Sequence, residues 1–255
     1  MQGGRTIGEN LLTATRSLAE AVLFTFKEMG PLMKRGLPVL GVLILFQLAS
    51  IYLLPQLTYA HKAVQTVLYS IFAVSWHRFT LLPESRSRPG FPLAFGMREI
   101  LFALVAAALT FMPSLLLYPV LSTLLPREAA IITVAVISLL VYIALLFVFP
   151  AIALDQKIRL ELFCRENFKL FFSYIIAGII GLFATWLLSL GVSFVLSTLA
   201  KLTGDMRTLT IIFTLISSFL SILFLGIFVS TISYLFRDVI GIEDEEAAGE
   251  PPSPR

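Results

Sequence analysis

Six long stretches of apolar residues alternate along the chain with shorter segments that carry most of the charge. The stretches are Leu37–Leu57, Ala63–Leu82, Ile100–Leu124, Ala129–Leu154, Phe168–Leu199 and Leu209–Phe236. A transmembrane helix needs about 20 consecutive, mainly apolar residues. The stretches are too long for strands and do not alternate with a period of two. The pattern predicts an all-α polytopic membrane protein, with six transmembrane helices in a single domain over residues 1–240.

Three of the polar segments have the pattern of an amphipathic helix. The clearest lies within the N-terminal segment, residues 1–36. Its apolar side carries Leu11, Leu18, Val22 and Phe26, and its polar side carries Glu9, Thr13, Arg16, Glu20 and Lys27. A weaker pattern covers Ile158–Lys169, and a shorter one covers Phe91–Glu99. Helices of this kind lie in the plane of the membrane interface, so we expect interfacial helices in all three places.

Lysine and arginine indicate which way the helices cross, because short cytoplasmic loops are enriched in them. Of the 19 such residues, only Lys62, Arg127, Lys201 and Arg207 fall on the opposite side, where the connections are very short. Both termini and the amphipathic segments are therefore expected in the cytoplasm. The end of the chain, residues 241–255, is acidic and rich in proline, which is typical of a disordered tail.

The order of elements suggests an internal repeat. Each pair of predicted spans follows one amphipathic segment, which gives three units of an amphipathic helix and a membrane hairpin. Any six-helix protein with short outer loops divides in the same way. Repeat and coincidence both stay open at this point.

Composition excludes several classes of protein. Hydrophobic residues make up 58% and charged residues 14%, whereas a soluble domain is about a quarter charged. Lys and Arg (19) nearly balance Asp and Glu (16), so no nucleic-acid partner is expected. One cysteine and two distant histidines, His61 and His77, give no disulfide and no metal-ligand spacing. Nucleotide-binding, zinc-protease and serine-hydrolase motifs are missing as well. We expect no cofactor, no metal and no enzymatic activity.

Ionisable residues gather at the predicted cytoplasmic ends of the second, fourth and sixth spans. They are His77 and Arg78, which follow Trp76, then Asp155 with Gln156 and Lys157 after it, then Arg237 and Asp238. Charge near hydrocarbon is costly unless it is paired, so Arg78 is expected to meet Asp155 or Asp238. One interpretation is a polar cluster that binds an anionic headgroup or gates a path. The other is that Trp76 belongs to an aromatic belt and the charges only mark helix ends.

Prolines and small residues modify the predicted spans. Pro113 and Pro119 lie inside the third span and Pro150 near the end of the fourth, where each removes a backbone donor and favours a kink. In the fifth and sixth spans, small residues recur at about every fourth position. They are Ala177, Gly181, Thr185, Ser189, Ser193 and Ser197, then Thr214, Ser218, Gly226 and Ser230. Such rows allow close helix packing in lipid.

Two motifs resemble those of a known group. The sequence 73–79, Ala-Val-Ser-Trp-His-Arg-Phe, is followed by Leu81-Leu82-Pro83-Glu84, and the second motif, 148–151, precedes the basic segment 157–169. Both resemble an uncharacterised six-helix family of bacterial inner-membrane proteins, similar to the membrane domain attached to some glycerophosphodiester phosphodiesterases. The family has glycine more often where Pro83 stands. The resemblance implies a bacterial cytoplasmic membrane, and no phosphodiesterase domain is present to carry that activity over.

Two functions follow as hypotheses. The first is a non-enzymatic accessory or scaffold protein that organises membrane lipids or a protein partner, or that forms a homo-oligomer. It is favoured by the amphipathic segments, the missing catalytic motifs and the packing rows. The alternative is a transporter or channel for a small or lipidic molecule, favoured by the broken third span and the polar cluster around Trp76, His77, Arg78, Asp155, Arg237 and Asp238.

Overall fold

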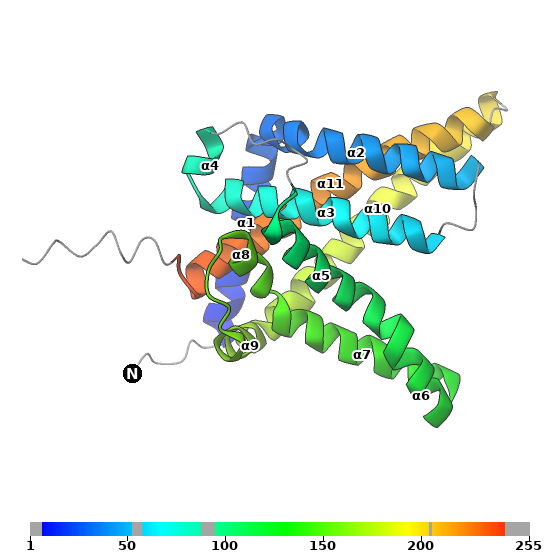
Figure 1. The fold of residues 1–255 in the computed structure, drawn as a ribbon. Coiled ribbons are helices and arrows are strands. Elements are labelled where there is room, and N and C mark those ends of the chain that lie inside the picture. The colour runs from blue at the N-terminus through cyan, green and yellow to red at the C-terminus, as the bar shows by residue number, and fades with distance from the viewer. Residues whose placement is uncertain (1–6, 53–57, 88–94, 204–205, 243–255) are drawn as a thin grey trace, which may run out of the picture.

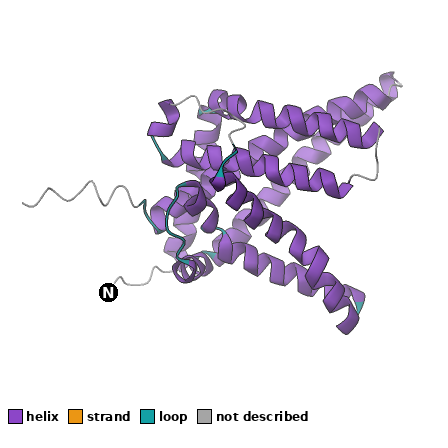
Figure 2. Ribbon diagram, in the orientation of Figure 1, coloured by secondary structure: helices purple, strands orange, loops and turns teal. Residues whose placement is uncertain are grey.

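The computed structural model describes residues 7–52, 58–87, 95–203 and 206–242, and these ranges are almost entirely helical. No strand occurs in them (Figure 2). The all-α prediction is therefore confirmed. The predicted tail, most of 241–255, and the start of the Phe91–Glu99 segment lie outside the described residues.

Twelve elements follow one another in the described ranges (Figure 1). They are α1 (Ile7–Lys27), α2 (Met29–Tyr52), α3 (Thr58–Leu81), α4 (Glu84–Ser87), α5 (Met97–Met112), η2 (Pro113–Leu117), α6 (Tyr118–Leu124), α7 (Arg127–Leu145), α8 (Val148–Ala153), α9 (Leu160–Lys169), α10 (Phe171–Thr203) and α11 (Met206–Val239). The pairs α2–α3, α5–α7 and α10–α11 are the long hairpins, and the α5–α7 pair diverges from the α2–α3 pair (Figure 1).

Four helices in the described ranges are long and apolar enough to cross a membrane. These stretches are Met29–Ala49, Met97–Leu124, Arg127–Leu145 and Ile211–Val239, and they overlap the first, third, fourth and sixth predicted spans. Within α10, a shorter apolar stretch runs over Trp186–Leu199. The chain therefore has the character of an integral membrane protein, while the full set of six spans and the threefold repeat stay predictions.

The second predicted span, α3, is less apolar than the others because it lies inside the protein. It packs against α2, α5, α8 and α11. The side chains of Phe72, Trp76 and His77 are almost completely buried. Polar side chains are tolerated in such a helix because neighbouring helices, rather than lipid, surround them.

The third predicted span is one continuous helical stretch with an internal change of hydrogen bonding. After α5, a five-residue π-helix, η2, begins at Pro113, and α6 continues from Tyr118. Proline has no N–H to donate, and its ring displaces the carbonyl one turn before it. The interruption predicted at Pro113 is thus present, as a widened turn of the kind that often accompanies such breaks.

The fourth predicted span is wrong at its end. The helix α7 stops at Leu145, and a turn at Leu146 and Phe147 leads into the separate short helix α8. All six residues of α8 are buried. Pro150 is the third residue of α8, where its missing N–H leaves no intrahelical bond unmade. The apolar run therefore continues past Leu145 because α8 packs into the protein core, and not because α7 extends to Leu154.

The N-terminal segment also differs from its predicted bounds. Residues 29–36, which were assigned to it, form the first turns of α2, while α1 ends at Lys27. The helix α1 runs across one end of the long helices and packs mainly on α11 (Figure 1). Its buried seam consists of small or polar residues at helical spacing, namely Asn10, Ala14, Ser17, Ala21 and Thr25. The predicted apolar side lies beside this seam, with Leu11, Leu18 and Val22 half-buried and Phe26 exposed.

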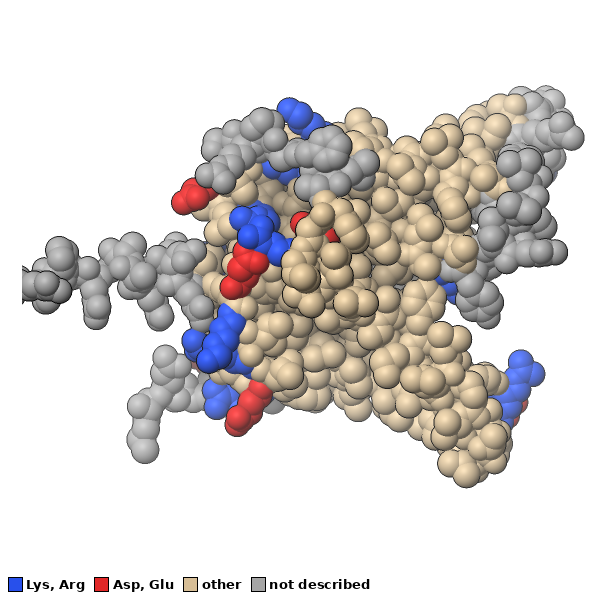
Figure 3. Space-filling model, viewed as in Figure 1, with Lys and Arg blue, Asp and Glu red and all other residues tan. Residues whose placement is uncertain are grey.

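The helix α9 has the amphipathic pattern predicted for Ile158–Lys169. Phe163 and Asn167 are buried, whereas Glu161, Arg165 and Lys169 are exposed on one face. Most of the charged side chains in Figure 3 lie at the end of the molecule that α1, α4, α8 and α9 form, which we call the charged end. The surfaces along the long helices are mainly uncharged in the same view.

Candidate functional site

Trp76 connects α3 to α11 inside the bundle. Its Nε1 donates to the carbonyl oxygen of Gly226 at 3.0 Å and to the hydroxyl of Ser230 at 2.8 Å. The indole is completely buried. The interpretation of Trp76 as part of an aromatic belt is therefore wrong, because its N–H is satisfied by a neighbouring helix and not by the membrane interface.

Gly226 makes the approach of the helices around Trp76 possible. A Cβ atom at this position would lie 2.7 Å from Cδ1 of Leu32 on α2 and 3.7 Å from Nε1 of Trp76. Gly36 has the same role on α2, where a Cβ atom would lie 2.8 Å from Cγ2 of Ile222. Glycines in membrane helices commonly serve such contacts. The sequence prediction that small residues pack against another helix holds at Gly226 and Ser230 of the sixth span, whereas Ser189, Ser193 and Ser197 of the fifth span are exposed.

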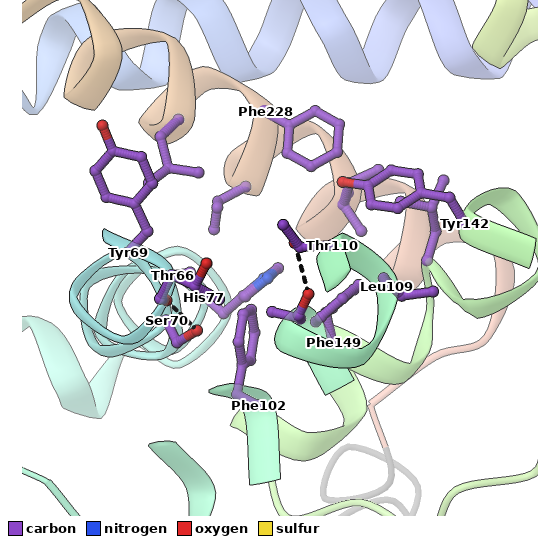
Figure 4. Close-up of a pocket in the computed structure, with 16 residues that line it drawn as sticks. Thr66, Tyr69, Ser70, His77, Phe102, Leu109, Thr110, Tyr142, Phe149 and Phe228 are labelled. Atoms are coloured by element: carbon purple, nitrogen blue, oxygen red, sulfur yellow. Dashed lines mark hydrogen bonds between the residues drawn. The ribbon is translucent and has the colours of Figure 1, made fainter. Parts of the chain in front are cut away.

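His77 is held by the next turn of α11. Its Nδ1 lies 2.7 Å from the hydroxyl of Ser233, and that hydroxyl donates to the carbonyl oxygen of Val229 at 2.8 Å. The single proton of the Ser233 hydroxyl serves one of these two contacts, so Nδ1 of His77 donates to Ser233 in the tautomer that keeps the bond to Val229. The ring extends toward the space between α3, α5 and α11 (Figure 4). This arrangement fixes the imidazole against α11, and both His77 and Ser233 are buried.

Arg78 and Asp155 meet, as the sequence predicted. A guanidinium nitrogen of Arg78 lies 3.9 Å from Oδ2 of Asp155 and donates to the carbonyl oxygen of Ala153 at 2.9 Å. Arg98, which the sequence interpretation did not include, forms a closer ion pair with the same carboxylate. The group of Arg78, Arg98 and Asp155 therefore has two positive charges and one negative charge, and we call it the arginine pair.

The position of Asp155 follows from the end of α8. Its backbone is in the left-handed region, with φ of 58°, and the N–H of Gln156 bonds to the carbonyl oxygen of Ala151 at 2.9 Å. This bond pattern is a common way to end a helix, and Asp is among the few residues other than Gly that adopt the conformation. The turn directs the chain, and with it the carboxylate, toward α3 and α5.

Arg237 and Asp238 belong to a separate group. Arg237 contacts Oδ1 of Asp238 at 2.9 Å and Oε2 of Glu20, on α1, at 3.7 Å. Glu20 in turn accepts a hydrogen bond of 2.8 Å from Arg16, which raises the pKa of Arg16. The six residues of the predicted cluster therefore divide into the Trp76–His77 contacts with α11, the arginine pair, and this chain of charges between α1 and α11.

A cavity of about 230 Å³ opens between α3, α5, α7 and α11 (Figure 4). We call it the crevice. Its ten apolar lining residues are Ala73, Phe102, Ala106, Leu109, Leu146, Phe149, Leu225, Phe228, Val229 and Ile232, and its six polar ones are Thr66, Tyr69, Ser70, His77, Thr110 and Tyr142. The hydroxyls of Ser70 and Thr110 donate to carbonyls of their own helices. Because these hydroxyl protons are already used, the walls of the crevice present a mainly apolar surface.

One end of the crevice adjoins the arginine pair. His77 and Phe102 line this end, while Arg78 follows His77 directly and Arg98 lies one turn before Phe102 on α5. The rings of Phe102 and Phe149, 4.7 Å apart between centroids, pack at the same end. No pattern in the sequence predicts the crevice, because it results from the divergence of the α5–α7 pair from α3 and α11.

No match to a known protein accompanies this geometry. The chain matches no model of a protein family, no curated protein and no solved structure. Within the described ranges, no group of three or more His, Cys, Asp and Glu side chains is placed to hold a metal ion. The crevice and the arginine pair are therefore interpreted from their own chemistry.

Proposed function

We propose that this protein is a non-enzymatic integral membrane protein that binds an anionic phospholipid at its side and so organises lipid around it. In this proposal all six predicted helices cross a bacterial inner membrane, and both termini and the charged end face the cytoplasm. The resemblance to bacterial inner-membrane proteins and the distribution of Lys and Arg support this placement.

The observation that carries the proposal is the crevice that ends beside the arginine pair. Its apolar walls suit an acyl chain, and Arg98, whose side chain is 42% exposed, stands at the level where α5 begins. An acyl chain gains little by leaving bilayer hydrocarbon for an apolar crevice, since both environments are equally dry. The headgroup must therefore supply the preference, and each Lys or Arg near a membrane surface contributes about 1 kcal/mol toward anionic lipid.

The test is native mass spectrometry of the protein from nanodiscs of phosphatidylethanolamine and phosphatidylglycerol in equal amounts. We expect retained phosphatidylglycerol to exceed retained phosphatidylethanolamine. Because 1 kcal/mol corresponds to about a fivefold change in affinity, Arg98→Gln is expected to reduce the ratio about fivefold. Arg16→Gln is the matched control, because Arg16 is an exposed arginine of α1 that lies outside the crevice. Equal retention of both lipids by the unaltered protein would overturn the proposal.

A second pair of variants tests the crevice itself. Ala106 on α5 lines the crevice, whereas Ala108 on the same helix does not. Ala106→Trp fills the cavity and is expected to release the bound lipid, while Ala108→Trp adds the same side chain and leaves retention unchanged. Similar retention in both variants would show that the lipid binds elsewhere.

The alternative function is a transporter or channel for a small or lipidic molecule. One observation favours it, which is that Tyr69 on α3 borders both the crevice and a second cavity between α2, α3 and α11. Removal of this ring by Tyr69→Ala would connect the two spaces. The assay applies an osmotic glycerol gradient to proteoliposomes and follows their light scattering. Liposomes that contain the Tyr69→Ala variant are expected to shrink and re-swell faster than empty liposomes. Identical traces with and without protein would count against transport of this probe.

A further inference from the structure

The second cavity differs from the crevice in its chemistry. It measures about 180 Å³ and lies between α2, α3 and α11, away from the charged end. Its lining residues are Leu43, Gln47, His61, Gln65, Tyr69, Ser217, Ser218 and Ser221. Seven of these eight side chains carry a hydrogen-bonding group. We call this space the polar cavity.

The polar residues come from one face of each helix. On α3, His61, Gln65 and Tyr69 follow one another at intervals of four, so they lie one above another on the same side. The hydroxyls of Ser217 and Ser221 on α11 donate to the carbonyl oxygens of Thr214 and Ser217. Their oxygen lone pairs stay available to accept a bond from another molecule.

A polar cavity lining within a membrane protein costs free energy unless a polar molecule fills the cavity. A polar group in an apolar environment costs several kcal/mol without a hydrogen-bond partner. His61 contains such an unsatisfied group. Its buried Nδ1 has no hydrogen-bond partner within the described part of the chain, and its ring packs on Phe46. Polar cavities that can hold water generally do hold it. The polar cavity is therefore hydrated when no other molecule is bound.

The lining also indicates what kind of molecule fits. None of the eight residues is Asp, Glu, Lys or Arg, so an ion would enter without a charged partner. Carboxamides, hydroxyls and an imidazole can both donate and accept, which matches a neutral compound rich in hydroxyl groups. At about 30 Å³ for each water molecule, the volume holds about six waters, or a molecule of about six heavy atoms.

We infer that the polar cavity is a hydrated binding site for a small neutral polyol of about the size of glycerol. The site is independent of the crevice and of the lipid proposed to bind there. Tyr69 forms the wall between the two spaces.

The experiment uses cysteine labelling of the full chain in nanodiscs, in a Cys164→Ser background that removes the only natural thiol. Ser218→Cys places a thiol in the polar cavity, and Phe219→Cys places one on the adjacent face of α11. Ser218 is 8% exposed and Phe219 39% exposed in the protein, so exposure alone favours reaction at 219. The thiolate that reacts needs water, so we expect a small water-soluble methanethiosulfonate to label position 218 about tenfold faster.

Binding is then measured as protection. We expect glycerol to slow labelling at position 218 several-fold and glucose, with twelve heavy atoms, to have no effect. Gln65→Leu is expected to abolish protection by glycerol while labelling continues. Slower labelling at 218 than at 219 would overturn hydration of the cavity. Rapid labelling that glycerol does not slow would overturn the polyol site and leave a cavity that holds water only.

Discussion

The indole of Trp76 and the hydroxyl of Ser230 share a 2.8 Å hydrogen bond although they are 154 residues apart in sequence. Both side chains are completely buried. The bond joins the central helix α3 to α11, and the adjacent contact between His77 and Ser233 joins the same two helices one turn further on. The main role of the motif that includes Trp76 and His77 is therefore to fix the position of α3 relative to α11.

Replacement of Trp76 by phenylalanine should destabilise the protein. The variant removes the indole donor that bonds to the Gly226 carbonyl and the Ser230 hydroxyl, and it opens a space that the smaller ring does not fill. We expect a loss of about 2–4 kcal/mol in the free energy of unfolding, measured as a lower thermal midpoint in nanodiscs. Trp186→Phe is the matched control, because Trp186 is 57% exposed, and its midpoint should be unchanged. Equal midpoints for the two variants would contradict the assigned role of Trp76.

Gly226→Ala should also lower stability, and for a different reason. The added methyl group would lie 2.7 Å from Cδ1 of Leu32, so α2 and α11 would have to separate or Leu32 to move. Overpacking of this kind costs about 1–3 kcal/mol. The double variant with Leu32→Ala should lose less than the sum of the two single variants, because the clash is then absent. Gly191→Ala on α10 meets no atom within 4 Å and should be neutral or slightly stabilising.

Much of this architecture could be predicted from the sequence, because apolar length and lysine and arginine placement are local properties. The helical class, the helix α9 and the contact between Arg78 and Asp155 all follow from such patterns. The boundary between α7 and α8 could not be predicted. Lipid and a protein interior both require apolar residues, so the run through Phe147 and Val148 is continuous even though the helix is not.

The candidate site shows the same division. The sequence indicates Trp76 as a candidate residue from its type and its neighbours. Its burial, however, depends on α11, which lies about 150 positions away in sequence. Arg98 was missed as the partner of Asp155 because α8 turns back toward α5 after a break that the sequence does not reveal. Cavities are harder still, since they depend on the angle between hairpins. The buried seam of α1 was missed in the same way, although a row of small and polar residues, Asn10, Ala14, Ser17, Ala21 and Thr25, is a pattern that favours close helix packing.

Asp155→Asn should increase the retention of anionic lipid. Asparagine tolerates the left-handed backbone that Asp155 adopts, so the turn after α8 is expected to persist. The substitution removes the negative charge between Arg78 and Arg98 and leaves two positive charges beside the crevice. We expect the ratio of phosphatidylglycerol to phosphatidylethanolamine in native mass spectra to rise by about fivefold, from about 1 kcal/mol for one unit of charge.

Asp155→Gly distinguishes an effect of the charge from an effect of the backbone conformation. Glycine adopts the left-handed conformation more easily than asparagine. The lipid ratio of this variant should therefore match that of Asp155→Asn, while its thermal midpoint should equal or exceed that of Asp155→Asn. A lower ratio in both variants would mean that the carboxylate of Asp155, and not the charges of Arg78 and Arg98, selects the lipid.

Substitutions of residue 17, in the seam between α1 and α11, should change the stability of the protein in opposite directions: a smaller residue should raise it and a larger one should lower it. Ser17 is completely buried, and its hydroxyl has no hydrogen-bond partner in the ranges that the structure describes. Ser17→Ala removes this unsatisfied group and favours the helix, so we expect a gain of about 1 kcal/mol. Ser17→Leu fits the same helix but overfills the seam, and a loss of about 1–3 kcal/mol is expected from the displacement of α1.

Thermal unfolding in nanodiscs measures both changes, and limited proteolysis between α1 and α2 reports whether α1 has detached. Ala19→Leu places the same leucine on the exposed side of α1 and should alter neither measurement. If α1 were held to the membrane by its apolar side alone, Ser17→Leu would behave like Ala19→Leu. A distinct loss at position 17 would instead show that packing on α11 holds α1 across the charged end, where Glu20 then meets Arg237.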